Sequence, residues 1–184
     1  AGAAEPAVRE LTEASRRFQT LARAGNASAD RMVAVADAET GDCLIYLQRL
    51  QEAATAFQAA IDRAGPHTVD LAVAANHMQL GLVRQRQGDY ARAAALYQTA
   101  RRMFEALGEP EGTARAWRQL ALTRKLEGDL PAALHACQQA LYLHEQHRNR
   151  GGIAETLGEL GHLHSAMRQP EEAALAYRRM AELC

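Results

Sequence analysis

Apolar residues recur along this chain at helical spacing, in blocks that repeat at a fixed interval. The segment 88–100 returns 40 residues later as 128–140 and again as 168–180, and 48–60 precedes it at the same step. Inside each block, small and large apolar residues follow one another at offsets of four and three, which places them on one face of an α-helix. A repeat without insertions is typical of a stacked array and not of a closed globule.

Two helices in each copy account for this spacing. The second helix carries an alanine, then a ring or a cysteine, then a small or flexible residue: Ala53, Phe57 and Ala60; Ala93, Tyr97 and Ala100; Ala133, Cys137 and Ala140; Ala173, Tyr177 and Met180. The first helix carries a large residue, a leucine and a glycine or alanine: His77, Leu80 and Gly81; Trp117, Leu120 and Ala121; Leu157, Leu160 and Gly161. Asp37, Thr40 and Gly41 hold these places in the degenerate first copy.

Glycine inside a helix costs about 0.5–1 kcal/mol relative to alanine, so its recurrence indicates close crossing of neighbouring helices. The pattern predicts a buried core that includes Leu80, Tyr97, Trp117, Leu120, Leu160 and Tyr177.

Caps and helix breakers predict nine helices and no strand. The expected ranges are 5–24, 29–47, 49–64, 68–87, 90–107, 110–127, 130–147, 150–167 and 170–183. Ser28, Thr68, Asp89 and Asp129 are the expected N-caps. The composition agrees, because the chain is rich in Ala, Leu, Gln, Arg and Glu and poor in the β-branched residues that favour strands.

The recurring motif, with its large residue, Leu-Gly, then Ala, ring and Ala, resembles the tetratricopeptide repeat over roughly residues 30–184. The resemblance implies a right-handed superhelical solenoid of antiparallel helix pairs. It implies one domain, 1–184, with an N-terminal helix at 5–24 and copies at 29–64, 68–107, 110–147 and 150–184. The chain departs from the family in two ways: its period is longer than the usual length of about 34 residues, and Arg84, Arg124 and His164 replace a usual aromatic residue.

In this family the first helices line a concave binding surface. Transferring those positions gives a candidate peptide-binding groove: Met78, Gln79, Leu82, Arg86, Arg115, Arg118, Gln119, Leu122, Lys125, Glu155, Glu159 and His162. The centre of this set is basic, and the planar guanidinium of arginine suits carboxylates, so a protein or peptide of acidic character is the expected partner. An alternative stays open, in which the basic side chains only solvate this face or pair with Glu155 and Glu159.

Several other partner classes are disfavoured. Family members that grip the carboxylate tails of chaperones use a lysine and an asparagine where Ala38 and Asp42 stand here, and Asp42 would repel such a tail. The formal net charge of −1 gives no reason to expect nucleic-acid binding. No apolar run approaches the roughly 20 residues that span a bilayer. Three cysteines without a C-x-x-C pair favour a reducing, cytoplasmic location, with Cys137 as a small buried residue.

No catalytic constellation, metal site or cofactor motif is evident, so we expect no enzyme activity. His162 and His164 would point to opposite sides of a helix. His144 and His147 could share a metal, but no further ligand completes the set, and surface histidines are the simpler interpretation.

Two functions remain open. The first is a stand-alone, non-catalytic scaffold that holds a peptide from a protein partner. The second is a regulatory or sensory segment of a larger signalling or transcription-regulating protein of bacterial type, which the absence of an initiator Met and the end at Cys184 favour slightly. Homodimerisation through uncapped ends is compatible with either function.

Overall fold

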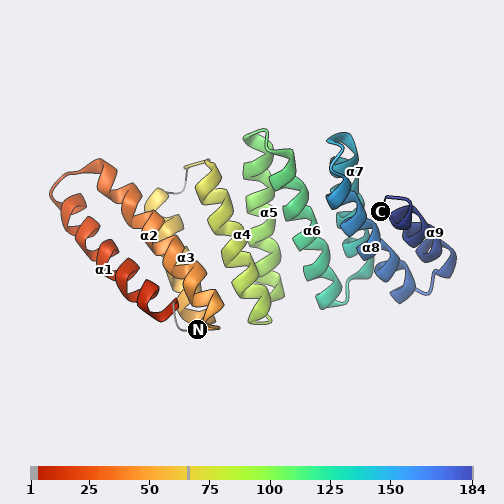
Figure 1. Cartoon of the computed structure of the whole chain (residues 1–184), viewed down its shortest axis with the longest axis horizontal. Helices are drawn as coiled ribbons and strands as arrows, with labels where there is room; N and C mark the ends of the chain where they lie inside the picture. The colour runs from red at the N-terminus through yellow and green to blue at the C-terminus, as the bar shows by residue number, and fades with distance from the viewer. Residues whose placement is uncertain (1–3, 66, 184) are drawn as a thin grey trace. The chain divides into compact units, whose positions relative to one another are not determined.

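The computed structural model describes residues 4–65 and 67–183, and in these residues the chain forms nine α-helices and no strand. In chain order they are α1 (Ala4–Arg23), α2 (Ala27–Tyr46), α3 (Leu50–Ala64), α4 (Leu71–Arg86), α5 (Tyr90–Ala106), α6 (Pro110–Glu127), α7 (Leu130–Gln146), α8 (Arg150–Ala166) and α9 (Pro170–Ala181) (Figure 1). The predicted all-α fold is confirmed, and every predicted helix is present.

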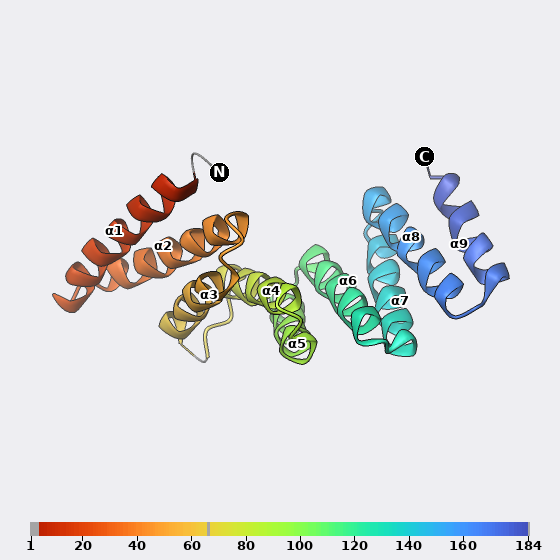
Figure 2. The same ribbon diagram turned by 90° about the horizontal axis from the view of Figure 1, so that it is seen from below.

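The chain divides into two compact units, Ala1–Leu96 and Tyr97–Cys184, and the boundary falls inside α5. In the first unit, α1 to α4 each pack against the next helix in the chain, and α2 also touches α4. In the second unit, α6 to α9 pack in the same sequential way, as Figure 2 shows for α8 and α9. Each unit is therefore built from helices that are neighbours in sequence.

Two of the predicted N-caps are wrong. Asn26, not Ser28, caps α2, and its side-chain oxygen accepts a hydrogen bond from the Ser28 backbone N–H at 3.1 Å. Asp70, not Thr68, caps α4, where it accepts from the Val73 N–H at 2.7 Å. The Thr68 hydroxyl instead donates to the carbonyl of Ala64 at the end of α3. In both cases the cap is an asparagine or aspartate two residues away from the predicted serine or threonine: Asn26 precedes Ser28, and Asp70 follows Thr68.

The turns between paired helices combine a left-handed residue with an acidic cap. Gly88 and Gly128 have φ values of 80° and 86°, in the region that favours glycine. The next residue in each turn, Asp89 or Asp129, accepts a hydrogen bond from a backbone N–H three positions later, at 3.2 and 3.1 Å. These two predicted caps are confirmed.

Three other turns place a non-glycine residue in the same left-handed conformation. Gln48, Arg148 and Arg168 have φ values of 61°, 53° and 58°. Such a backbone costs roughly 1–2 kcal/mol in residues that carry a Cβ, so these turns are less favourable than those at Gly88 and Gly128.

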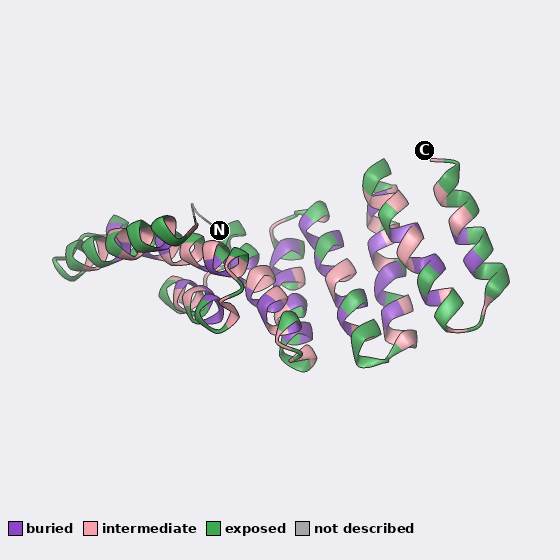
Figure 3. Cartoon of the chain, turned by 60° about the horizontal axis from the view of Figure 1, so that its bottom comes forward, coloured by how far each residue is buried: buried purple, intermediate pink, exposed green. Residues whose placement is uncertain are grey.

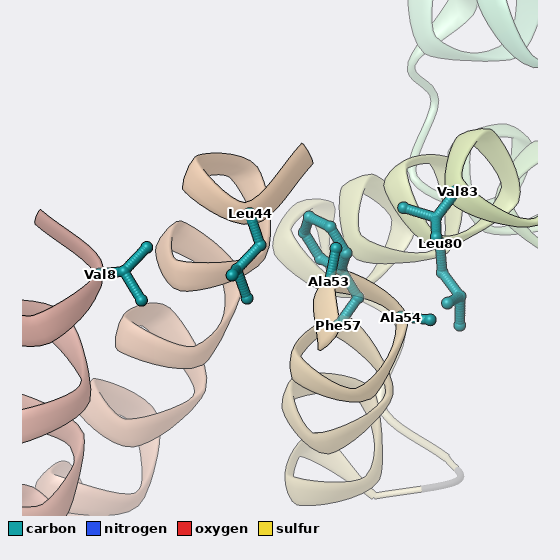
Figure 4. Close-up of a cluster of buried hydrophobic side chains, with 7 residues drawn as sticks. All are labelled: Val8, Leu44, Ala53, Ala54, Phe57, Leu80 and Val83. Carbon is teal, nitrogen blue, oxygen red and sulfur yellow. The ribbon is translucent and has the colours of Figure 1, made fainter. Parts of the chain in front are cut away.

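Buried residues lie mainly along the lines where helices meet, while the outward faces are exposed (Figure 3). In the first unit, one cluster joins all four helices: Val8, Leu44, Ala53, Ala54, Phe57, Leu80 and Val83 (Figure 4). Phe57 is completely buried in this cluster. The alanines beside it allow the close approach that the sequence pattern predicts.

Glycines in the first helices make room for rings from the second helices. A Cβ added at Gly41 would lie 2.7 Å from the Phe57 ring, and one added at Gly161 would lie 2.5 Å from the Tyr177 ring. Both distances are far below a normal carbon–carbon contact. The tight crossing predicted at the small residue of the first helix is present at both positions.

A second kind of crossing joins each second helix to the first helix of the next copy in the second unit. A Cβ at Gly112 would lie 2.5 Å from the Phe104 ring, and one at Gly152 would collide with the ring of His144. His144 is only 5% exposed. The prediction of a surface histidine is therefore wrong at this position, because His144 fills the place that Phe104 fills one copy earlier.

All six residues of the predicted core are buried or partly buried. Leu80, Tyr97, Leu120 and Leu160 are buried, each with at most 6% exposure. Trp117 and Tyr177 are only partly buried. The Trp117 ring borders an open cavity, and Tyr177 belongs to the final helix, α9, where its hydroxyl meets an exposed histidine.

Candidate binding surface

The candidate residues fall on both units, and those of the second unit lie on α6 and α8. Arg115, Leu122 and Lys125 of α6 are exposed, and Leu122 keeps 39% of its surface accessible. Their spacing of seven and three residues places them on one face of the helix. This face therefore combines two cations with an apolar side chain.

Arg118 lies on the same face, but its guanidinium already has a partner within the chain. Its guanidinium forms an ion pair with the carboxylate of Glu155 on α8, and 27% of the Arg118 side chain is exposed. This contact supports, for Arg118, the alternative that the basic residues pair with the acidic residues of the next copy. Such a pair near solvent contributes about 0–1 kcal/mol to stability, so its main effect is to fix both side chains in place.

Glu159 forms a second link between copies. The Cys137 thiol on α7 donates to its Oε2 at 3.7 Å. Burial raises the pKa of Glu159, whereas Arg118, the Cys137 hydrogen bond and Lys125 lower it. Burial also raises the pKa of Cys137 to about 12, helped by the nearby Glu159. The thiol is therefore a protonated donor and not a nucleophile.

At the end of this surface, His162 of α8 is exposed and contacts Tyr177. Its Nδ1 lies 3.1 Å from the Tyr177 hydroxyl, and the two rings meet edge to face with centroids 5.8 Å apart. The remaining candidate, Gln119, is partly buried, and its side-chain oxygen has no hydrogen-bond partner among the described residues.

The candidates of the first unit lie on α4. Met78, Gln79 and Leu82 are partly buried and Arg86 is exposed. The Gln79 side chain donates to Asp42 of α2 at 2.5 Å. Burial raises the pKa of Asp42; the hydrogen bond from Gln79 opposes this shift, and the charge of Glu39 adds to it. The surface of this unit is thus acidic on α2 and carries a cation at the end of α4.

Sequence reasoning selected these helix faces but missed two features beside them. It assigned Cys137 to packing, whereas the thiol also bonds to Glu159. It did not find a cavity of about 590 Å³ on another face of α6, lined by Trp117 and Tyr142 among others. The hydrogen bond of Cys137 had one signal in the sequence, because Cys137 replaces a ring found in the other copies. A single sequence carries no signal for the cavity.

In the described part of the chain, no three His, Cys, Asp or Glu side chains lie close enough to hold a metal ion. None of the helices in residues 4–65 and 67–183 is both long and apolar enough to cross a bilayer.

Comparison with known proteins identifies the kind of array that these helices form. By sequence, no curated protein is similar to the chain. Residues 70–146 match the model of the tetratricopeptide repeat family. Solved structures resemble the chain at low identity and therefore inform the fold alone.

BtubC (BKLC) from P. vanneervenii is 17% identical, with a TM-score of 0.80 over 98% of this chain and 73% of that one. The Rap conjugation gene regulator of plasmid pLS20, solved in complex with the Phr* peptide, is 15% identical, with a TM-score of 0.70 over 86% of this chain and 44% of that one. MamA from Desulfovibrio magneticus RS-1 is 19% identical, with a TM-score of 0.66 over 96% and 94%.

These similarities define the class as a helical repeat protein of the solenoid type. Within this solenoid, residues 70–146 match tetratricopeptide repeats by sequence. Repeats of this family typically mediate protein–protein interactions and are typically non-catalytic scaffolds.

Proposed function

We propose that the chain is a non-catalytic scaffold that binds a protein or peptide on the exposed faces of its first helices, and that the α6 face prefers acidic segments. The observation that carries this proposal is the exposed row of Arg115, Leu122 and Lys125. Arg115 has no ion pair among the described residues, so it is available to a ligand carboxylate. Leu122 supplies apolar contact between the cations.

A peptide selection followed by direct binding measurements tests this proposal. Peptides selected from a random display library should be enriched in Asp and Glu, and their affinity should fall as salt rises, because exposed charges are screened over about 8–10 Å at physiological ionic strength. The double variant Arg115→Ala/Lys125→Ala should bind them several-fold more weakly.

Arg178→Ala is the matched control, because Arg178 is exposed on α9, a second helix. Arg118 is left intact because its loss would free Glu155. Unchanged affinity of the double variant, or selection of basic peptides that require these same residues, would refute the proposed preference.

A second candidate function is a peptide-responsive regulatory segment of a larger protein. The similarity to the Rap conjugation gene regulator, of which this chain covers 44%, favours it. The complete gene sequence tests this candidate: an appended output or DNA-binding domain would support it, and a gene that encodes only these repeats would refute it.

Two further parts of the proposal concern the cellular location of the protein and its self-association. We propose a cytoplasmic location, with which the free thiols of Cys43 and Cys137 are compatible. Homodimerisation through the terminal helices would appear in sedimentation equilibrium as a concentration-dependent mass, and a constant monomer mass would refute it.

A further inference from the structure

A cavity in the second unit lies away from the proposed peptide-binding face. It has a volume of about 590 Å³ and is bordered by the end of α5, the start of α6 and the end of α7. Pro110, Thr113 and Trp117 line it from α6. Their spacing of three and four residues defines a face of α6 different from that of Arg115, Leu122 and Lys125. The volume lies within the range of about 300–1,000 Å³ that ligand pockets occupy.

On one wall of the cavity, an arginine of the chain itself packs over an aromatic ring. The guanidinium of Arg101 lies 4.6 Å from the centre of the Trp117 ring and forms an ion pair with Glu105 at 2.5 Å. The ring of His135 also packs edge to face against Trp117, with the ring centroids 5.8 Å apart. An arginine, an aromatic face and a carboxylate of the chain are thus already in contact on this wall, where the Arg101 side chain is 21% exposed and that of Glu105 is 45% exposed.

The lining of the cavity also holds a second aromatic residue, Tyr142, and a second carboxylate, that of Glu109. Tyr142 is 58% exposed. Glu109, at the start of α6, makes no side-chain capping bond, and its carboxylate has no ion pair in the described residues. Because Arg101 neutralises Glu105, the charged side chains that line the cavity leave one negative charge uncompensated.

We propose that this cavity is a second binding site, and that it takes an arginine side chain of a protein partner. The incoming guanidinium stacks on Tyr142 and pairs with Glu109, repeating the arrangement that Arg101 makes with Trp117 and Glu105. Arginine fits better than lysine because its planar group stacks on aromatic rings and is more weakly hydrated. The proposal is independent of the peptide-binding face, since it uses none of the same residues.

Trp117 is the only tryptophan of the chain, so its fluorescence reports on the cavity directly. The full chain is titrated with the blocked peptide acetyl-Gly-Arg-Gly-amide and, in parallel, with the corresponding glutamate peptide. The arginine peptide should change the emission saturably in the millimolar range, whereas the glutamate peptide should not. Tyr142→Ala and Glu109→Gln should each weaken arginine binding by roughly 2–5-fold, as expected for an exposed cation–π contact and an exposed ion pair.

Three further variants make the result specific. Tyr142→Phe keeps the ring and should bind as the parent does. Tyr46→Ala removes a tyrosine that is 67% exposed on α2 and should have no effect. The Arg115→Ala/Lys125→Ala variant should retain arginine binding, so failure of the peptide-face proposal and of this one are distinguishable. Absence of saturation, equal binding of the glutamate peptide, or unchanged affinity in both Tyr142→Ala and Glu109→Gln would overturn the proposal.

Discussion

Replacement of Gly161 by alanine tests whether the helix crossings depend on the missing side chain. Gly161 lies in the interior of α8, where alanine is intrinsically better than glycine by about 0.5–1 kcal/mol. In this structure, however, the added Cβ would lie 2.5 Å from two atoms of the Tyr177 ring. Overpacking of this kind typically costs about 1–3 kcal/mol. We therefore expect a net loss of about 1–2 kcal/mol.

Gly151→Ala on the same helix is the matched control. The nearest atom to a Cβ at Gly151 is an oxygen of Asn149 at 3.7 Å, an ordinary contact. This variant should be as stable as the parent or more stable. Thermal and urea unfolding followed by circular dichroism measures both changes, and a loss of 1 kcal/mol corresponds to roughly 2–4 °C in Tm for a chain of this size.

A double variant shows whether the ring is the cause. Gly161→Ala combined with Tyr177→Cys recreates the residue types of Ala121 and Cys137 in the preceding copy. Removing the ring is costly by itself, but the two changes should compensate with a coupling energy of about 1 kcal/mol or more in a double-mutant cycle. If Gly161→Ala is stabilising, or if the two substitutions are additive, the tight crossing between α8 and α9 is not what requires glycine.

Three other measurements address single features of the chain. Arg168→Gly should raise the free energy of unfolding by about 0.5–1 kcal/mol, because Arg168 has a φ of 58°; an unchanged midpoint in urea would contradict this. Burial and the charge of Arg118 lower the pKa of His144 below its ordinary value of 6.5, against a smaller opposing effect of Glu111. The unfolded chain therefore binds the proton more readily than the folded chain, and the free energy of unfolding decreases as pH falls through about 6.5. His144→Phe should remove that part of the pH dependence, and identical slopes in parent and variant between pH 7 and 5 would show otherwise. Alkylation with iodoacetamide at pH 8, read by peptide mass spectrometry, should modify Cys43 well before Cys137, whose thiol has a pKa of about 12; faster modification of Cys137 would contradict its burial.

Most of the fold was predictable because each helix is specified by neighbouring residues. The periodic apolar positions indicate where the helices lie, and the caps Asp89 and Asp129 mark two of their starts; both can be read along the sequence. His144 was misjudged because histidine usually lies at the surface, although its alignment with Phe104 marked it as a core position. The cavity that Trp117 borders was not predictable, because it depends on how three helices leave space around the ring.

The candidate binding surface was only partly accessible to sequence reasoning. The helix faces that carry Arg115 and Lys125 follow from the family pattern, and the pairing of Arg118 with Glu155 was one of two alternatives that the charges allowed. The hydrogen bond between Cys137 and Glu159 depends on the distance between α7 and α8, which no spacing along one helix specifies. The same reason explains why the cavity beside Tyr142 was not foreseen.

The packing of each helix against its neighbours in sequence has a consequence for how the protein folds. Contacts that join residues close together along the chain require little loop closure, and proteins rich in such contacts fold in microseconds to milliseconds. Within each unit, a nucleus can form at any helix pair and grow outward, since no distant segment has to arrive first. Hydrogen exchange should therefore proceed in steps, with the amides of α1 and α9 exchanging first and those of α3 and α7 protected longest.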